Sequence, residues 1–159
     1  MADRIASHSN ELTNDETVSL PQSDEARLRE MLEAGESVVQ TLPTDYTLEG
    51  MFGTEWLILT NRRVMALGTE RVESVSLQDI TSVIIVDYQG NSVLRVFTEL
   101  QAYDMVRYSR THAARFSSVP LQIEELVQEA VHEEREIVPP SERWKAKSGG
   151  RRRNRCPQC

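Results

Sequence analysis

Short apolar runs rich in β-branched and aromatic residues, each bounded by Gly, Asn or charged residues, fill the chain from Glu36 to Ser109. Runs of this length, closed by turn residues, are typical of β-strands joined in antiparallel hairpins. Seven strands are expected, and in order they read SVVQTL, MFGTEWLILT, RVMALG, RVESVSL, TSVIIVDY, SVLRVFT and AYDMVRYS. Turns are expected at Asn61-Arg62, Gly68-Thr69-Glu70 and Gly90-Asn91. The fourth run has the weakest pattern, because its apolar residues do not share one face.

A short helix is expected before the first strand. Ser23 or Asp24 can cap its N-terminus, the following residues place apolar side chains near one face, and Gly35 stands where a helix would stop. We therefore predict a helix from about residue 24 to Ala34.

A longer helix is predicted after the last strand, from Thr111 to about Glu134. Apolar residues recur at helical spacing between Phe116 and Val131, which gives the helix one face to bury against the sheet. Pro120 lacks an amide hydrogen, so we expect a short turn over residues 111–117 and then the main helix from Ser118.

The two ends of the chain differ from this middle part in composition and charge. Residues 1–23 are polar without a period that could bury a face, so disorder is expected there, with the domain over residues 24–136. Residues 137–159 are expected to form a basic linker, because residues 143–159 carry seven Lys and Arg and no Asp or Glu. The whole chain has a net charge of -7, which leaves -14 on residues 1–142. Contacts with phosphate-rich surfaces are therefore expected at the tail.

Neither a membrane-spanning run nor a secretory signal is visible in the pattern. The mean hydropathy is -0.45, and the apolar runs are much shorter than the roughly 20 residues that cross a bilayer. The first 25 residues lack a basic start followed by an apolar stretch. Both observations favour a cytoplasmic location.

A strand–turn–strand segment, EWLILTNRRVMALG, resembles the signature of bacterial pleckstrin-homology-like domains, and the likeness continues through SLQDITSVIIVDYQGNSVLRV. This resemblance implies an α+β, mainly β fold: a seven-stranded antiparallel barrel whose open end is capped by the C-terminal helix. The short N-terminal helix and disordered tails would be additions to it.

The order of GES, the EWLILTNRRVMALG segment, MVRYSRTHAARF, a helix, a basic linker and Cys-Pro-x-Cys is similar to the cytosolic N-terminal extension of a group of bacterial ABC exporters. The resemblance implies a zinc ribbon, transmembrane helices and an ATPase beyond Cys159, so that this chain would be an N-terminal fragment. The domain would then act at the inner face of the plasma membrane, as part of a transporter.

Cys156 and Cys159 are the candidate metal ligands. Two cysteines separated by two residues can hold one tetrahedral zinc ion, but such a site needs four ligands. We interpret the pair as half of a zinc knuckle that is completed outside this chain. A redox function, metal binding between molecules, and no role in this fragment stay open as alternatives.

Five arginines are candidates for contact with partners. Arg151, Arg152 and Arg153 can contact anionic lipid or nucleic acid weakly, but a solvated linker is the favoured interpretation, because no aromatic residues interleave with these arginines. Arg62 and Arg63, at a predicted hairpin turn, could bind an acidic partner, but solvated turn charges are the favoured interpretation.

Phosphoinositide binding and catalysis are not expected. The loop between the first two strands contains Asp45, Glu49 and Glu55 without Lys or Arg, so it would repel a phosphorylated head group. No phosphate-binding loop or nucleophile motif is present, and His112 has no orienting carboxylate that the sequence makes obvious. An enzyme is therefore the least favoured class.

The leading hypothesis is a non-catalytic interaction or regulatory domain from an ABC-type exporter, with a protein or the rest of the transporter as its partner. The alternative is a free-standing protein-binding adaptor whose basic tail contacts nucleic acid or anionic membrane.

Overall fold

The computed structural model describes residues 18–137, and residues 1–17 and 138–159 lie outside the described part. The seven predicted strands are confirmed, and they form two open antiparallel sheets. The first sheet has the order β1-β2-β3-β4 and the second β5-β6-β7. The bounds are β1 Val38–Pro43, β2 Trp56–Thr60, β3 Arg63–Leu67, β4 Val72–Ser76, β5 Ile80–Asp87, β6 Asn91–Thr98 and β7 Ala102–Ser109.

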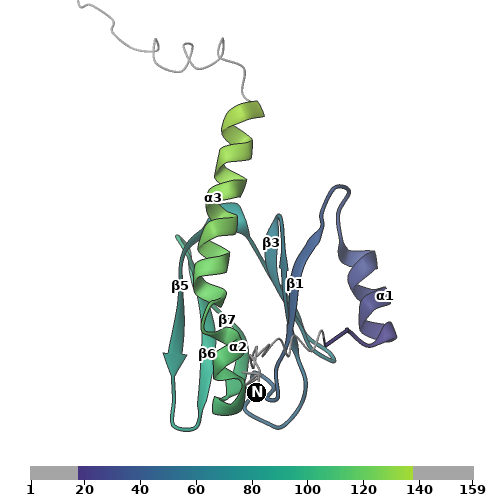
Figure 1. Ribbon diagram of the computed structural model, residues 1–159, viewed down its shortest axis with the longest axis vertical. Helices are drawn as coiled ribbons and strands as arrows, with labels where there is room; N and C mark the ends of the chain where they lie inside the picture. Colours follow the sequence, from purple (N-terminus) through teal and green to yellow (C-terminus); the bar gives the residue numbers. More distant parts are fainter. Residues whose placement is uncertain (1–17, 138–159) are drawn as a thin grey trace, which may run out of the picture.

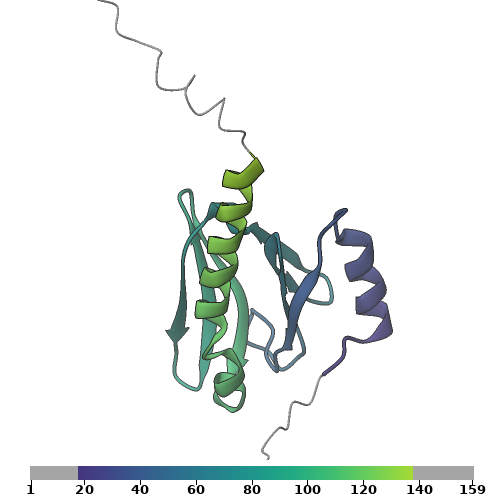
Figure 2. The ribbon, with the colours of Figure 1, turned by 45° about the horizontal axis from the view of Figure 1, so that its top comes forward.

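The α+β, mainly β class is thereby confirmed, whereas a closed barrel is not shown. Each sheet contains only sequential hairpin neighbours, and the short 3-10 helix η1 (Leu77–Asp79) carries the chain from the first sheet to the second. In Figures 1 and 2 the sheets stand on either side of helix α3, with the three-stranded sheet on the left.

The second strand begins later than its apolar run predicts. β2 starts at Trp56, and Met51–Glu55 belong to the preceding loop. Gly50 has φ +88°, a left-handed conformation that glycine adopts without a Cβ penalty. This conformation lets the loop turn, so that Tyr46 forms β-bridges with both Phe52 and Arg107. The regular pairing of β1 with β2 therefore does not extend to residues before Trp56.

Strand β2 is buried on both faces, which explains its unbroken run of apolar residues. Leu57 and Leu59 face the main core, between the two sheets and α3. Trp56 and Ile58 face the opposite side, where Leu28 of helix α1 (Gln22–Met31) covers them. The first sheet is therefore sandwiched between α1 and the main core (Figure 2).

Helix α1 differs from its prediction at both ends. It begins two residues early because the chain leaves Pro21, whose carbonyl accepts from the amide of Glu25 at 2.9 Å. Residues 22–23, which were expected to be disordered, are thus helical. It ends at Met31 because the carboxylate of Glu36 accepts from the amide of Glu33 at 2.9 Å and Arg63 donates to the Met31 carbonyl.

The C-terminal helical segment agrees with its prediction except at its end, because α3 continues past the expected end near Glu134 to Ile137, which was expected in the linker. A short turn made of η2 (Arg110–His112) and α2 (Ala113–Phe116) precedes α3, which runs Val119–Ile137 with Pro120 in its first turn. Phe116, Val119 and Ile123 are fully buried in the main core. Beyond that core, the last turns of α3 project past the sheets (Figures 1 and 2).

Candidate functional site: a groove between the β2–β3 turn and helix α3

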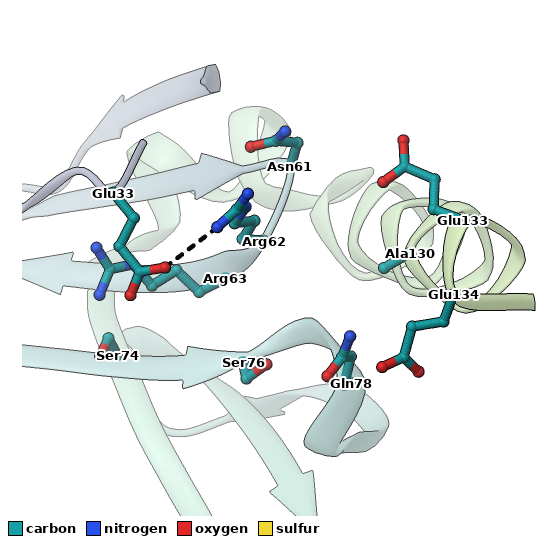
Figure 3. A pocket seen from close by; sticks show the side chains of 10 residues that line it. All are labelled: Glu33, Asn61, Arg62, Arg63, Ser74, Ser76, Gln78, Ala130, Glu133 and Glu134. Atoms are coloured by element: carbon teal, nitrogen blue, oxygen red, sulfur yellow. Dashed lines mark hydrogen bonds and ion pairs between the residues drawn. The ribbon is translucent and has the colours of Figure 1, made fainter. Parts of the chain in front are cut away.

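A groove of about 490 Å³ opens between the turn that joins β2 to β3 and the projecting end of α3. The sequence segments that meet there are far apart in the chain. Its lining residues are Glu33, Asn61, Arg62, Arg63, Ser74, Ser76, Gln78, Ala130, Glu133 and Glu134. Figure 3 shows the turn and β4 on one side of the groove and α3 on the other.

The turn is held by the hydroxyl of Thr60, a fully buried residue. This oxygen accepts from the amides of Arg62, at 3.1 Å, and Arg63, at 2.9 Å, and it donates to the carboxylate of Glu36 at 2.8 Å. A threonine in this place therefore fixes the turn and connects it to the segment before β1.

Asn61 attaches the same turn to the α1–β1 connection. Its amide oxygen accepts from the backbone N–H of Ser37 at 2.8 Å, and its amide nitrogen donates to the carbonyl of Gly35 at 3.2 Å. Gly35 has φ +78°, which a residue with a Cβ rarely adopts. The Leu-Thr-Asn-Arg-Arg segment and the Gly-Glu-Ser segment thus form one structural unit.

Arg63 is committed to this unit. Its guanidinium binds both carboxylate oxygens of Glu36, at 2.9 and 3.0 Å, and its side chain is 21% exposed while that of Glu36 has no exposed surface. Burial raises the pKa of Glu36, but the hydrogen bonds from Arg63 and two further donors outweigh it, so the pKa lies below its ordinary value. Arg63 therefore builds the site and has little capacity for a partner.

Arg62 points toward the groove and keeps a solvated guanidinium. It pairs with Glu33 at 3.2 Å, and both side chains are at least half exposed, so this pair contributes little to stability. Across the groove stand the carboxylates of Glu133 and Glu134 (Figure 3). The groove thus carries a basic group on the turn and acidic groups on the helix, all accessible to a partner.

A second polar cluster lies at the junction of β7 with the helical segment. The carboxylate of Asp45 accepts from the backbone N–H of Ser109 at 2.9 Å and from its hydroxyl, and Nδ1 of His112 lies 3.6 Å from Asp45 Oδ1. The sequence makes no carboxylate near His112 obvious, because Asp45 reaches it only through the folding back of the loop before β2. The Ser109 hydroxyl donates to Asp45 and not to His112, so the arrangement fastens the loop and does not activate a nucleophile.

Two of the acidic residues in the β1–β2 loop interact with other side chains of the domain. Asp45 is bound as described, and burial raises the pKa of Glu55, whose carboxylate lies 3.5 Å from Arg71. Glu49 stays exposed. The loop itself contains no Lys or Arg that could bind a phosphate group.

Of the five predicted contact arginines, the structure brings Arg62 and Arg63 together in the groove. Arg151, Arg152 and Arg153 lie outside the described residues, as do the predicted ligands Cys156 and Cys159. Within residues 18–137 there is no cluster of three or more His, Cys, Asp or Glu side chains that could hold a metal ion. No helix in the same range is long and apolar enough to cross a membrane.

Sequence reasoning missed the acidic half of the site. Glu36 was visible in the Gly-Glu-Ser segment, but its pairing with a residue 27 positions away has no local signal. Glu133 and Glu134 lie in the predicted C-terminal helix, and only the packing of α3 places them opposite Arg62.

Comparison with known proteins gave no match to a family model, to a curated protein or to a solved structure.

Proposed function

We propose that residues 24–136 form a non-catalytic docking domain of the pleckstrin-homology-like type, which binds a protein segment in the groove between the β2–β3 turn and α3. The observation that carries this proposal is the groove's two charged walls, with Arg62 on the turn and Glu133 and Glu134 on the helix. A peptide that presents an acidic and a basic side chain can meet both walls at once.

The construction of the groove supports docking over reaction chemistry. The turn side of the groove is held by hydrogen bonds of Arg63, Glu36, Thr60 and Asn61, which are formed before a partner binds. A preformed surface of this kind loses less conformational entropy on binding. The accessible side chains that remain are suited to ion pairs and hydrogen bonds.

We further propose that the domain belongs to the cytosolic N-terminal extension of an ABC-type exporter, with the rest of the transporter as its partner. The basis is the order of sequence segments, which ends in Cys156-Pro-Gln-Cys159. In this proposal the cysteine pair is half of a zinc knuckle, and zinc binds once two more ligands follow. ATP hydrolysis would take place in the part beyond Cys159.

The genomic reading frame tests the exporter proposal. A frame that continues past codon 159 into a second Cys-x-x-Cys, long apolar runs and an ATPase would support it. A stop codon directly after Cys159 would favour the alternative, a free-standing adaptor whose basic tail contacts nucleic acid or anionic membrane.

A peptide array tests the groove itself. Overlapping peptides that cover the continued reading frame would be probed with this chain, with Arg62→Glu and with Arg115→Glu, where Arg115 is an exposed arginine of α2 outside the groove. Peptides bound by the wild-type chain and by Arg115→Glu should be lost with Arg62→Glu. Equal binding by both variants would refute docking in this groove.

A further inference from the structure

Three glutamates form a row along the side of α3 that faces the first sheet. Glu125, Glu129 and Glu133 follow one another at four-residue intervals, so they lie on one side of the helix with a rise of about 6 Å between neighbours. Glu133 lines the groove described above, and the other two line a neighbouring hollow of about 420 Å³. The ion pairs of the described residues leave all three carboxylates without a partner.

The wall opposite this row is the outer edge of β1. β1 is the terminal strand of its sheet, and within residues 18–137 no strand pairs with its outer edge. Val39, 56% exposed, and Gln40 line the hollow from this side, together with Leu59 of β2, and Leu126 faces them from α3. A free strand edge beside an acidic helix suits an extended segment with alternating basic and apolar residues.

We propose that residues 143–147 of this same chain occupy the hollow between β1 and α3. Their sequence is Arg-Trp-Lys-Ala-Lys, in which basic side chains alternate with Trp144 and Ala146. In an extended backbone, alternate residues share a face and lie about 6.6 Å apart, close to the rise between the glutamates of the row. The basic side chains would face the row, and Trp144 and Ala146 would face the apolar wall at Val39.

The chain length permits this return. α3 ends at Ile137, and Glu133 lies one turn, about 6 Å, below that end. Residues 138–142 can span up to about 16 Å when extended, enough to reverse direction and bring Arg143 level with Glu133. Lys145 then reaches Glu129, and Lys147 reaches Glu125. The contact would shield part of the acidic helix wall from other partners, and it does not depend on the exporter assignment.

Charge exchange in the full chain tests the contact, with Trp144 as the reporter. The chain has two tryptophans, and Trp56 is 4% exposed, so quenching by acrylamide reports mainly on Trp144. Glu129→Lys should increase the quenching and shift the emission to longer wavelength, and Lys145→Glu should do the same. The two changes together should restore the wild-type quenching, because the pair is re-formed with the charges exchanged.

Glu124→Lys is the matched control, since Glu124 is an exposed glutamate of α3 that lines neither hollow. It should leave Trp144 as protected as in the wild type, and equal urea midpoints for the two α3 variants would show that both are folded. Equal quenching of wild type and Glu129→Lys would overturn the proposal. Protection that disappears on dilution would also overturn it, because the segment would then bind a second copy of the chain.

Discussion

Arg63 of β3 binds both carboxylate oxygens of Glu36, 27 residues earlier in the chain, at 2.9 and 3.0 Å. The same guanidinium donates to the carbonyl of Met31, where α1 ends. One side chain therefore joins three elements: the end of α1, the connection to β1 and the β2–β3 hairpin. The proposed docking surface at that hairpin depends on this junction.

Arg63→Met should strongly destabilise the protein. The substitution keeps much of the aliphatic volume but leaves the carboxylate of Glu36, whose side chain has no exposed surface, without its cation. Loss of one partner of a buried pair costs about 3–5 kcal/mol, and the remaining solvent access of Arg63 places the expected loss near the lower end, about 3 kcal/mol. Urea unfolding at pH 7 measures it.

Arg62→Met is the matched control for this prediction. Its ion pair with Glu33 is exposed, so the free energy of unfolding should change by less than about 1 kcal/mol. Similar losses for the two variants would contradict the division between a structural Arg63 and an accessible Arg62.

Acid should weaken the protein through two carboxylates. The pKa of Glu36 and the pKa of Asp45 both lie below their ordinary values, since hydrogen bonds to the charged forms outweigh the opposing effect of burial. A group whose pKa is lower in the folded state stabilises above its unfolded pKa, and this stability is lost as pH falls through the folded value. The free energy of unfolding should therefore decrease as the pH falls below about 4, near the unfolded pKa values.

Asp45→Asn isolates one of these groups. Its free energy of unfolding should be lower than that of the wild type at pH 7, and the difference should shrink at low pH, where Asp45 of the wild type is itself protonated. A difference that stays constant from pH 7 to pH 3 would show that the charge of Asp45 is not what fastens Ser109.

The strands could be predicted from the sequence because each has a local pattern and hairpin partners that follow directly in the chain. Even the poorly patterned β4 was found, since Gly68 and its neighbours mark the turn before it. The burial of Trp56 and Ile58 could not be predicted, because it depends on α1 packing across the outer face of the first sheet. The apolar run WLIL predicted a buried strand, but it did not indicate that α1 covers the face of this strand opposite the main core.

The candidate site was half predictable for the same reason. Arg62 stood out as a charge at a turn, whereas the opposing wall depends on how α3 crosses the sheets. Asp45 and His112 also lie far apart in the sequence, and no periodic pattern predicts that their side chains come close together. The sequence thus predicted the charged turn, but not which distant segment of the chain lies opposite it.

Glu55→Gln should stabilise the protein at neutral pH by about 1 kcal/mol, because one carboxylate oxygen of Glu55 is buried without a hydrogen-bond donor. Burial raises the pKa of Glu55 despite the nearby Arg71, so the charged form is less favoured in the folded state than in the unfolded chain. Stability from this group is present below the unfolded pKa and is lost as pH rises. Urea unfolding at pH 4 and pH 7 should show the gain only at pH 7.

The attachment of the C-terminal helices can be followed through Tyr108. Its ring stacks on that of Phe116, with centroids 4.1 Å apart and planes at 9°, and both residues are essentially buried. Burial raises the pKa of Tyr108 to about 12. In the wild type, its phenolate absorbance should therefore appear well above pH 10, the ordinary tyrosine value, and stability should fall as pH rises from about 10 toward 12.

Phe116→Ala should lower that last step, because the cavity admits water to the Tyr108 hydroxyl, and it should cost about 3–5 kcal/mol of unfolding free energy. Phe116→Leu fills most of the space and should cost less while keeping the high titration step. Tyr108→Phe identifies the step by removing it. If the absorbance above pH 11 is unchanged in Tyr108→Phe, the step belongs to another tyrosine and the stacked pair does not control it.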